Sequence, residues 1–204
     1  MRRPHREPDS ADVIRGFARN HPGGTLLCLG PLTNLARVII EDPTALTGLG
    51  SIVISGGVGF GGRGVRQLSD TNTRCDPRAA AVVARAASLP IRWVGLDVSS
   101  ALGLRAVDLP SSGIGDFTSL RGYGLLRRNR GFRGWSAPCH DLVAAAVALD
   151  DDCVRTRPGR MAVRADVSPA HLIGVPGADS AHRIATAVDV DQVRGFLTRW
   201  TSNS

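Results

Sequence analysis

The residues best suited to chemistry lie in three short polar segments. Cys139-His140-Asp141 directly precedes the apolar stretch Leu142–Leu149, and the other two segments are Gly30-Pro31-Leu32-Thr33-Asn34 and Asp70-Thr71-Asn72. A histidine beside a carboxylate can transfer protons or bind a metal. A carboxylate and an amide two positions apart point to one side of an extended segment, where they suit the recognition of hydroxyl groups.

Each of these segments also has a purely structural interpretation. Asp141 can cap the apolar helix expected after it, which leaves His140 as a surface or packing residue. Thr33-Asn34 can cap the helix that follows, and Asp70-Thr71-Asn72 can be a solvated turn. Residue type and spacing alone leave both interpretations open at all three segments.

The elements that must position these segments alternate between strand and helix along the chain. Short apolar runs predict strands, and runs with helical spacing predict helices. Asp76-Pro77 is a strong helix start, because Asp accepts hydrogen bonds from free amides and Pro loses none at the first helical position. The expected strands are Thr25–Leu29, Ser51–Ser55, Ile91–Leu96 and Met161–Val167, and the expected helices are Ala11–Arg19 with Ser10 as N-cap, Leu35–Glu41, Arg78–Ala87, Leu142–Leu149 and Val190–Trp200.

This alternation predicts an α/β fold with a mostly parallel sheet and flanking helices, Rossmann-like in architecture. Such sheets bind ligands beyond the carboxyl ends of their strands. Thr33, the loop Gly56–Asn72 and Asp97 follow expected strands, so we expect them to converge at one edge. Gly57–Gly62 fits the GxGxxG pattern, but no helix signal occurs at its third glycine. This favours a flexible loop beside the site over a dinucleotide site.

Length and composition indicate a single domain. The chain has 204 residues, and we expect one domain over 1–204, with flexible ends at about 1–10 and 201–204. No apolar run approaches the length of a membrane span, and Met1–Asn20 is polar and charged, so no signal peptide is expected. The four cysteines are widely spaced, which fits reduced thiols in a cytoplasmic protein better than disulfides or a zinc site.

The net charge of +7 raises the question of nucleic-acid binding, because a basic surface attracts phosphates. Every basic residue is Arg and none is Lys, a skew that a GC-rich genome would produce. The arginines are scattered along the chain, apart from Arg127-Arg128-Asn129-Arg130 and nearby Arg133. Nucleic-acid binding is therefore not the favoured function.

Taken in order, the polar segments resemble the inosine–uridine nucleoside hydrolase family. The order and spacing match from about Asp12 to Trp200. The resemblance implies hydrolysis of the N-glycosidic bond of purine or pyrimidine ribonucleosides to ribose and base, with a bound calcium ion. The matching blocks are Leu29-Gly30-Pro31-Leu32-Thr33-Asn34-Leu35-Ala36, Ile54-Ser55-Gly56-Gly57, Asp70-Thr71-Asn72 with Asp76-Pro77 and Ala79–Ala81, Gly95-Leu96-Asp97-Val98, and His140-Asp141.

The resemblance also implies roles for individual residues. Thr33 corresponds to a residue whose backbone carbonyl ligates calcium, and Asp141 corresponds to a carboxylate ligand. Asn72 and Asp70 correspond to contacts with the ribose hydroxyls, where the family usually has Glu, one methylene longer, in place of Asp70. His140 corresponds to the histidine that helps the base to depart. Calcium prefers oxygen ligands, and a proton donor near the leaving base lowers the barrier.

Three features depart from the family pattern. Ser55 stands where the family commonly has Met against the ribose, and Arg63 lies where an Asn follows glycine. The family opens with a strand ending in DxDxxxDD, which supplies the base that activates water and most calcium carboxylates, and Met1–Asn20 contains no match. We therefore expect a chain that lacks the family's first strands, an incomplete calcium site, and slow or absent hydrolysis by this chain alone.

Two further functions stay open. A non-catalytic protein could bind nucleoside or ribose, or an interaction partner, through the same pocket without turnover. A basic protein associated with nucleic acid would use Arg127–Arg133. A sheet without its first strands would also leave an edge exposed, which favours association with a partner or a homo-oligomer.

Overall fold

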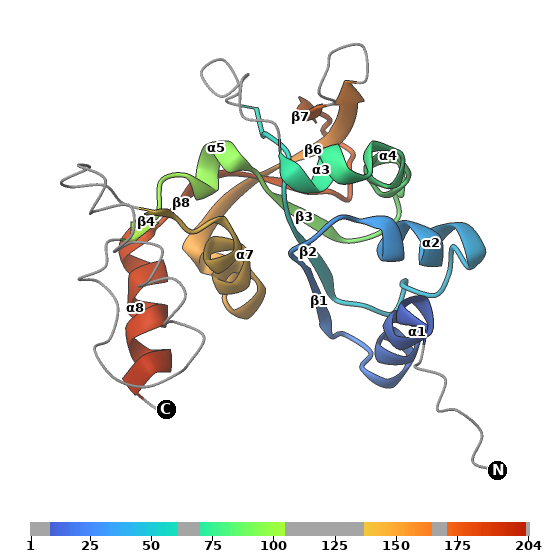
Figure 1. Cartoon of the computed structure of the whole chain (residues 1–204), viewed down its shortest axis with the longest axis horizontal. Helices are drawn as coiled ribbons and strands as arrows, with labels where there is room; N and C mark the ends of the chain where they lie inside the picture. The colour runs from blue at the N-terminus through green and yellow to red at the C-terminus, as the bar shows by residue number, and fades with distance from the viewer. Residues whose placement is uncertain (1–8, 61–69, 105–136, 165–170, 203–204) are drawn as a thin grey trace.

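The computed structural model describes residues 9–60, 70–104, 137–164 and 171–202 (Figure 1). The expected flexible ends lie largely outside these ranges. The elements in chain order are α1 (Ser10–Asn20), β1 (Thr25–Cys28), α2 (Thr33–Glu41), β2 (Ser51–Ser55), α3 (Thr71–Cys75), α4 (Pro77–Ala84), β3 (Ile91–Val94), α5 (Leu96–Ser99), β4 (Gly103–Leu104), β5 (Ala137–Pro138), α7 (His140–Leu149), a 3-10 turn (Asp151–Cys153), β6 (Val154–Arg164), β7 (His171–Pro176), β8 (Arg183–Val188) and α8 (Val190–Ser202).

A six-stranded sheet forms the centre of the described structure, with strand order β1-β2-β3-β8-β6-β7. Strands β1, β2, β3 and β8 are parallel, whereas β6 pairs antiparallel with both β8 and β7. The short strands β4 and β5 pair with each other, apart from this sheet. The predicted α/β fold with a mostly parallel sheet is confirmed.

The antiparallel part of the sheet differs most from the expected elements. Strand β6 begins at Val154, whereas the sequence predicts a strand that begins only at Met161. The sequence predicts neither β7 nor β8. Within β6, Pro158 hides the strand signal, because proline usually argues against a strand interior. Here Pro158 is the last residue that pairs with β8, and the next residue is the first that pairs with β7. The proline is tolerated because it lies at this change of partner.

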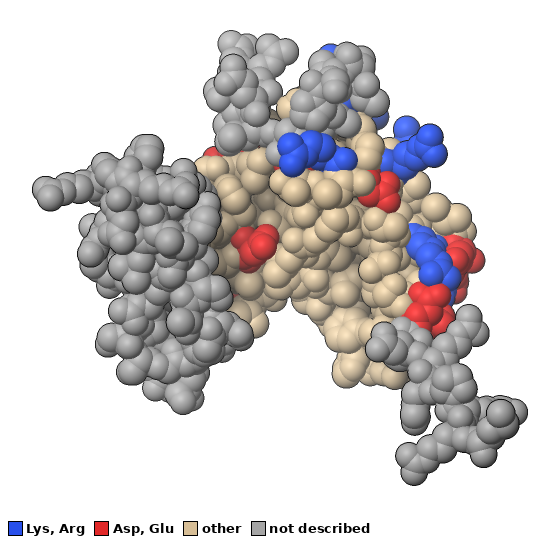
Figure 2. Space-filling view, in the orientation of Figure 1, with Lys and Arg blue, Asp and Glu red and all other residues tan. Residues whose placement is uncertain are grey.

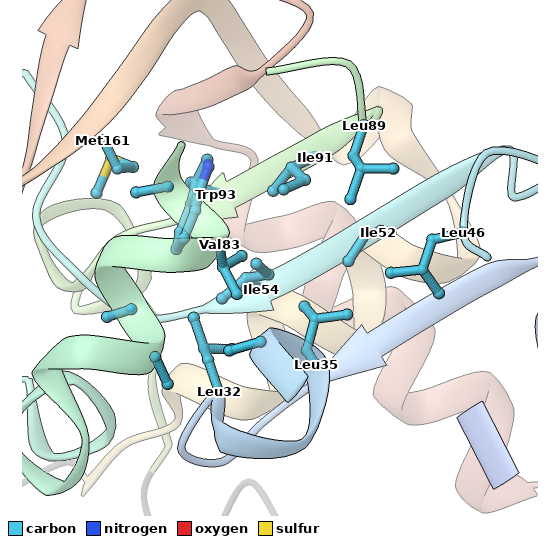
Figure 3. Close-up of a cluster of buried hydrophobic side chains, with 14 of the residues drawn as sticks. Leu32, Leu35, Leu46, Ile52, Ile54, Val83, Leu89, Ile91, Trp93 and Met161 are labelled. Carbon is cyan, nitrogen blue, oxygen red and sulfur yellow. The ribbon is translucent and has the colours of Figure 1, made fainter. Parts of the chain in front are cut away.

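Helices cover both faces of the sheet, and the central parallel strands β2 and β3 are largely buried (Figure 1). One core cluster lies between the sheet and α1, α2 and α4, and Figure 3 shows its largest side chains, with Trp93 of β3 beside Val83 of α4. The second cluster joins the other face to α5, α7 and α8. Along β2, Ile52 and Ile54 enter the first cluster and Val53 enters the second. This explains why the strand is apolar at successive positions.

The structure corrects the expected cap of α1, confirms that of α4, and shows that Asp141 does not cap α7. Helix α1 is capped by Asp9, whose carboxylate accepts a hydrogen bond from the Ala11 amide, and Ser10 is its first residue. Asp76 caps α4 as predicted, accepting from the amide of Ala79. Helix α7 begins at His140 without a side-chain cap, so Asp141 lies in its first turn. A carboxylate there is stabilised by the helix dipole without being the cap.

In Figure 2, acidic and basic side chains lie together at the right of the view, one acidic group stands alone left of the centre, and most of the described surface between them is uncharged. Between α1 and α2, Arg15 pairs with Asp12 and Glu41, and Arg37 pairs with Asp9 and Glu41. Exposed pairs of this kind contribute little to stability. The carboxylates neutralise Arg15 and Arg37 locally, so these arginines do not form a basic surface between α1 and α2.

The four cysteines all lie within the described residues, where they form no disulfide and have different surroundings. Cys75 is exposed at the end of α3, Cys139 is half-buried before α7, and Cys153 is buried. Burial raises the pKa of the Cys28 thiol, on β1, to about 12. The expectation of reduced thiols agrees with these separate environments. No helix within the described ranges is both long enough and apolar enough to cross a membrane.

Candidate functional site

Asp70 is buried and lies immediately before α3. The sequence suggested an extended segment at Asp70–Asn72. The structure instead has a helix that begins at Thr71, with Asp70 as its N-cap. One carboxylate oxygen accepts from the Asn72 amide at 3.0 Å. The other accepts from the Gly57 amide at 3.0 Å, and from the amide and hydroxyl of Thr73 at 3.1 and 2.5 Å. Both oxygens of Asp70 are therefore engaged by the protein's own loop and helix.

Two glycines at the end of β2 allow Asp70 to lie this close. Gly56 and Gly57 have φ angles of 154° and 72°, which residues with a side chain rarely adopt. A Cβ atom on Gly56 would lie 2.8 Å from an Asp70 oxygen, and one on Gly57 would lie 3.0 Å from the Leu172 carbonyl oxygen. The Ile54-Ser55-Gly56-Gly57 block is thus explained by geometry.

Asn72 joins the ends of the first two strands. Its amide nitrogen Nδ2 donates to the carbonyl oxygens of Leu29 and Ser55, each at 3.2 Å. Leu29 follows β1 directly and Ser55 ends β2, so the asparagine lies at the carboxyl edge of the sheet. Within the described part of the chain, the Oδ1 atom of Asn72 accepts no hydrogen bond. This oxygen is the group that a ligand hydroxyl could meet.

Asp141 reaches the same edge from α7 on the other face. The buried hydroxyl of Ser55 donates to Asp141 Oδ1 at 2.9 Å. Through Ser55, whose carbonyl accepts from Asn72 and whose hydroxyl donates to Asp141, the two predicted site residues are brought together at the end of β2. Sequence reasoning treated Ser55 only as a departure from a family pattern. The signal it missed is a hydroxyl at the end of a buried apolar strand.

His140 is half-buried next to this pair. Its Nδ1 lies 2.7 Å from the Ser99 hydroxyl oxygen, which in turn lies 2.9 Å from the Gly95 carbonyl oxygen. Burial lowers the pKa of His140, and the negative charges of Asp141 and Asp70 partly offset this. Ser99 was not predicted, because the expected strand Ile91–Leu96 hid the start of α5. In the structure the strand ends at Val94 and Leu96 opens the helix.

Thr33 lies further along the same edge. It is the first residue of α2, with Leu32 at the N-cap position, and its hydroxyl donates to Asp76 at 2.7 Å. The Ala79 amide and this hydroxyl lower the pKa of Asp76. The bond ties the start of α2 to the start of α4. Among the described residues, no hydrogen bond connects Thr33 with Asp141, the other predicted calcium ligand.

The described residues do not fit a complete calcium site. Calcium takes six to eight oxygen ligands. In the ranges that the structure describes, no group of three or more His, Cys, Asp or Glu side chains could hold a metal. Asp70 already accepts from four donors, three at Oδ2 and one at Oδ1, so the candidate ligands are the Asp141 carboxylate and the Thr33 carbonyl. Two ligands are too few for tight binding. Arg63 lies outside the described residues.

A cavity of about 610 Å³ lies elsewhere, beside α4 and β6. Its lining includes Arg85, Arg160, Asp179 and His182, and none of the predicted site residues. His182 is buried there, with Nε2 at 2.9 Å from the Ala86 carbonyl and Nδ1 accepting from the Trp93 indole at 3.4 Å. Both ring nitrogens are engaged, so this histidine is structural.

The fold and the polar edge together define an α/β protein with a candidate ligand site at the carboxyl ends of its parallel strands. The model of the inosine-uridine preferring nucleoside hydrolase family matches residues 2–195. The chain therefore belongs to this family. It is 29% identical over 194 residues to the non-specific ribonucleoside hydrolase RihC of Salmonella newport, and 36% identical over 104 residues to uridine nucleosidase 1 of Arabidopsis thaliana.

Solved structures show the same fold. The purine-preferring ribonucleoside hydrolase from Gardnerella vaginalis superimposes with a TM-score of 0.78 at 24% identity, over 98% of this chain and 67% of its own. A plant nucleoside hydrolase, the PpNRh1 enzyme, gives 0.76 at 22% identity over 97% and 67%. The matches cover 91% of this chain and 62% of the Salmonella protein, and 50% of this chain and 31% of the Arabidopsis protein. The chain thus spans about two thirds or less of these relatives.

Proposed function

We propose that this chain is a ribonucleoside hydrolase-type protein that binds a nucleoside where β1, β2 and α7 meet. The observation that carries the proposal is the bridge from Asn72 through Ser55 to Asp141 at the carboxyl edge of the sheet. It brings an amide oxygen and a carboxylate to the place where sheets of this kind bind ligands. Membership of the nucleoside hydrolase family supplies the substrate class, purine or pyrimidine ribonucleosides.

The proposed roles follow the chemistry of each group. The free amide oxygen of Asn72 accepts a hydrogen bond from a ribose hydroxyl. His140 assists departure of the base, since breaking the N-glycosidic bond leaves negative charge on the base and positive charge on the sugar. Asp70 is the second proposed ribose contact, but its hydrogen bonds favour a role in holding the loop that faces the ribose. A direct contact would require some of these bonds to break.

Calcium is the proposed cofactor because of the family, with Asp141 and Thr33 as its ligands. When bound, it would hold the ribose diol oxygens and orient a water molecule. Since these residues form only part of a site, we expect the chain alone to bind calcium with a Kd weaker than about 10⁻⁴ M, the range of sites with few protein ligands. We expect hydrolysis to be slow or absent for the same reason.

The test uses the purified 204-residue chain with inosine and with uridine, with calcium and with a chelator present. Binding is measured by thermal stabilisation and turnover by the release of ribose. We expect stabilisation by nucleoside, weakened in Asn72→Ala and unchanged in Thr47→Ala, an exposed threonine away from the edge. No binding of either nucleoside would overturn the proposed substrate class. Calcium-dependent turnover near an ordinary enzyme rate of about 10 s⁻¹ would overturn the incomplete site.

The second candidate function is a nucleoside or ribose binder without catalysis. It is favoured by the hydrogen bonds of Asp70, because this side chain holds the protein's own loop and helix. Stabilisation by nucleoside with no ribose released would select it. For a nucleic-acid function, Arg127–Arg133 lies outside the described residues, and strongly salt-dependent binding to oligonucleotides would be its signature.

We also propose a cytoplasmic location, since the four cysteines are widely spaced and form no disulfide with one another. A homo-oligomer is part of the proposal as well. Among the described strands, β1 pairs with β2 only, so its other edge can accept a further strand. Light scattering during size-exclusion chromatography measures the mass in solution. We expect a species heavier than 21.5 kDa, and a monodisperse monomer would contradict this.

A further inference from the structure

The contact between Ser99 and His140 allows the protons of both groups to be assigned. Ser99 ends α5 and is fully buried, so water does not compete for its hydroxyl. The hydroxyl has one proton and a carbonyl oxygen can only accept, so an oxygen–oxygen distance of 2.9 Å to Gly95 requires that proton to lie between them. A serine that donates to the carbonyl four residues earlier is a common helical arrangement.

With its proton directed to Gly95, the Ser99 oxygen presents only lone pairs to His140. The Nδ1 atom at 2.7 Å must therefore carry a hydrogen and donate it. We propose that Ser99 fixes the tautomer of His140, with the proton on Nδ1 and a bare Nε2 in the neutral ring. Ser99 is thus a positioning residue that acts through the histidine.

The bare Nε2 determines the kind of group that this side of the site can receive. Within the described residues Nε2 has no hydrogen-bond partner, so it is the ring nitrogen available to a ligand. An unprotonated ring nitrogen accepts, and the ligand group that meets it must be a donor such as an O–H or N–H. Any consequence of the bare Nε2 for catalysis rests on the proposed function. To protonate a departing base, as proposed above, His140 would first have to take up a second proton, on Nε2.

Another histidine, the buried His182, is in the opposite tautomeric state. The indole N–H of Trp93 can only donate, so Nδ1 of His182 is bare. Its Nε2 lies 2.9 Å from the Ala86 carbonyl oxygen, which can only accept, so Nε2 carries the proton. His182 therefore serves as an internal reference of the other tautomer in the same spectrum.

Long-range proton–nitrogen correlation spectra of the full chain with ¹⁵N-labelled histidine measure both tautomers directly. Spectra are recorded where both rings are neutral, and His140→Gln and His182→Gln assign the signals. We expect the protonated-type nitrogen to be Nδ1 in His140 and Nε2 in His182. In Ser99→Ala, we expect the Nδ1 signal of His140 to shift toward the average of both tautomers and the His182 signals to stay unchanged. In the control Ser100→Ala, which removes an exposed neighbouring hydroxyl, we expect the His140 signals to stay unchanged. Ser99→Thr, which keeps the hydroxyl, retains the shift of the unmodified chain.

A proton on Nε2 of His140 in the unmodified chain would overturn the proposal, as would a signal unaffected by Ser99→Ala. The unmodified chain decides the matter even if Ser99→Ala does not fold. The measurement needs neither nucleoside nor turnover, so failure of the proposed function leaves it intact. Conversely, an Nε2–H tautomer would refute the role of Ser99 without changing whether nucleosides bind.

Discussion

At the scale of single residues, the polar side chains of the site first stabilise the protein itself. The hydroxyl of Ser55 joins β2 to Asp141 of α7, whereas the hydroxyl of Ser51 in the same strand is buried with no hydrogen-bond partner in the described structure. Both serines lie in β2, but only Ser55 has a hydrogen-bond partner. Comparing their alanine variants therefore measures how much the hydrogen bond between Ser55 and Asp141 contributes to stability.

We expect Ser55→Ala to lower the free energy of unfolding by about 1 kcal/mol, the usual net contribution of one hydrogen bond. Ser51→Ala should leave it unchanged or raise it slightly, because it removes an unsatisfied buried hydroxyl. Urea denaturation followed by circular dichroism measures both. Equal losses in the two variants would show that the bridge to Asp141 contributes nothing.

Asp70 should be more important than any single hydrogen bond, because four donors converge on its carboxylate. We expect Asp70→Ala to lower the free energy of unfolding by about 3 kcal/mol, since buried amides of Gly57 and Thr73 lose their acceptor. Asp12→Ala, at an exposed ion pair, should change it by about 0.5 kcal/mol or less. The same denaturation experiment compares them, and similar losses would contradict the capping role.

At the scale of elements, the sequence predicts the first three strands well, but the later strands and the polar turns poorly. The runs that became β1, β2 and β3 are continuous and apolar, and Asp76-Pro77 marks the start of α4 by local chemistry alone. Helix α3 has five residues and a polar sequence, so its existence depends on Asp70 meeting Gly57 across the turn. The contacts of Ser55 and Ser99 are likewise long-range. The spacing of residues along the chain does not predict such long-range contacts.

Glycine at the end of β2 is required by its conformation and by the closeness of Asp70. We expect Gly56→Ala to destabilise the protein by about 2 kcal/mol through strain and overlap with the carboxylate. Gly16 lies within α1 with no atom within 4 Å of an added Cβ, so Gly16→Ala should stabilise by about 0.5–1 kcal/mol. Midpoints of thermal unfolding report both signs. A stable Gly56→Ala protein would refute the proposed fit.

At the scale of the whole molecule, the buried ring of His182 couples folding to pH. Burial lowers the pKa of His182, and the hydrogen bond to Ala86 partly offsets this. Between the lowered pKa and the unfolded value of about 6.5, the unfolded chain binds more protons than the folded one. Stability therefore rises with pH through this window and is lost as pH falls through it.

We expect the unfolding midpoint to drop between pH 7 and pH 5, with a shallower drop in His182→Gln, which cannot take up the proton. The comparison uses the slope of the unfolding midpoint against pH, because packing lost in the variant lowers the midpoint equally at every pH and does not change this slope. Acidic groups with lowered pKa values, such as Asp76, act in the same direction at lower pH, outside this range. Parallel slopes for the two proteins would assign the pH dependence to other groups.

The thiol at the end of α3 makes the protein suitable for optical measurements of ligand binding. Cys75 is exposed and three residues from Asn72, whereas Cys153 is buried and the Cys28 thiol stays protonated because of its raised pKa. Since thiolates react with maleimides and protonated thiols do not, a fluorophore should attach at Cys75 far faster than at either of them. A dye at that position would sit beside the strand ends and respond to a nucleoside without any need for catalysis.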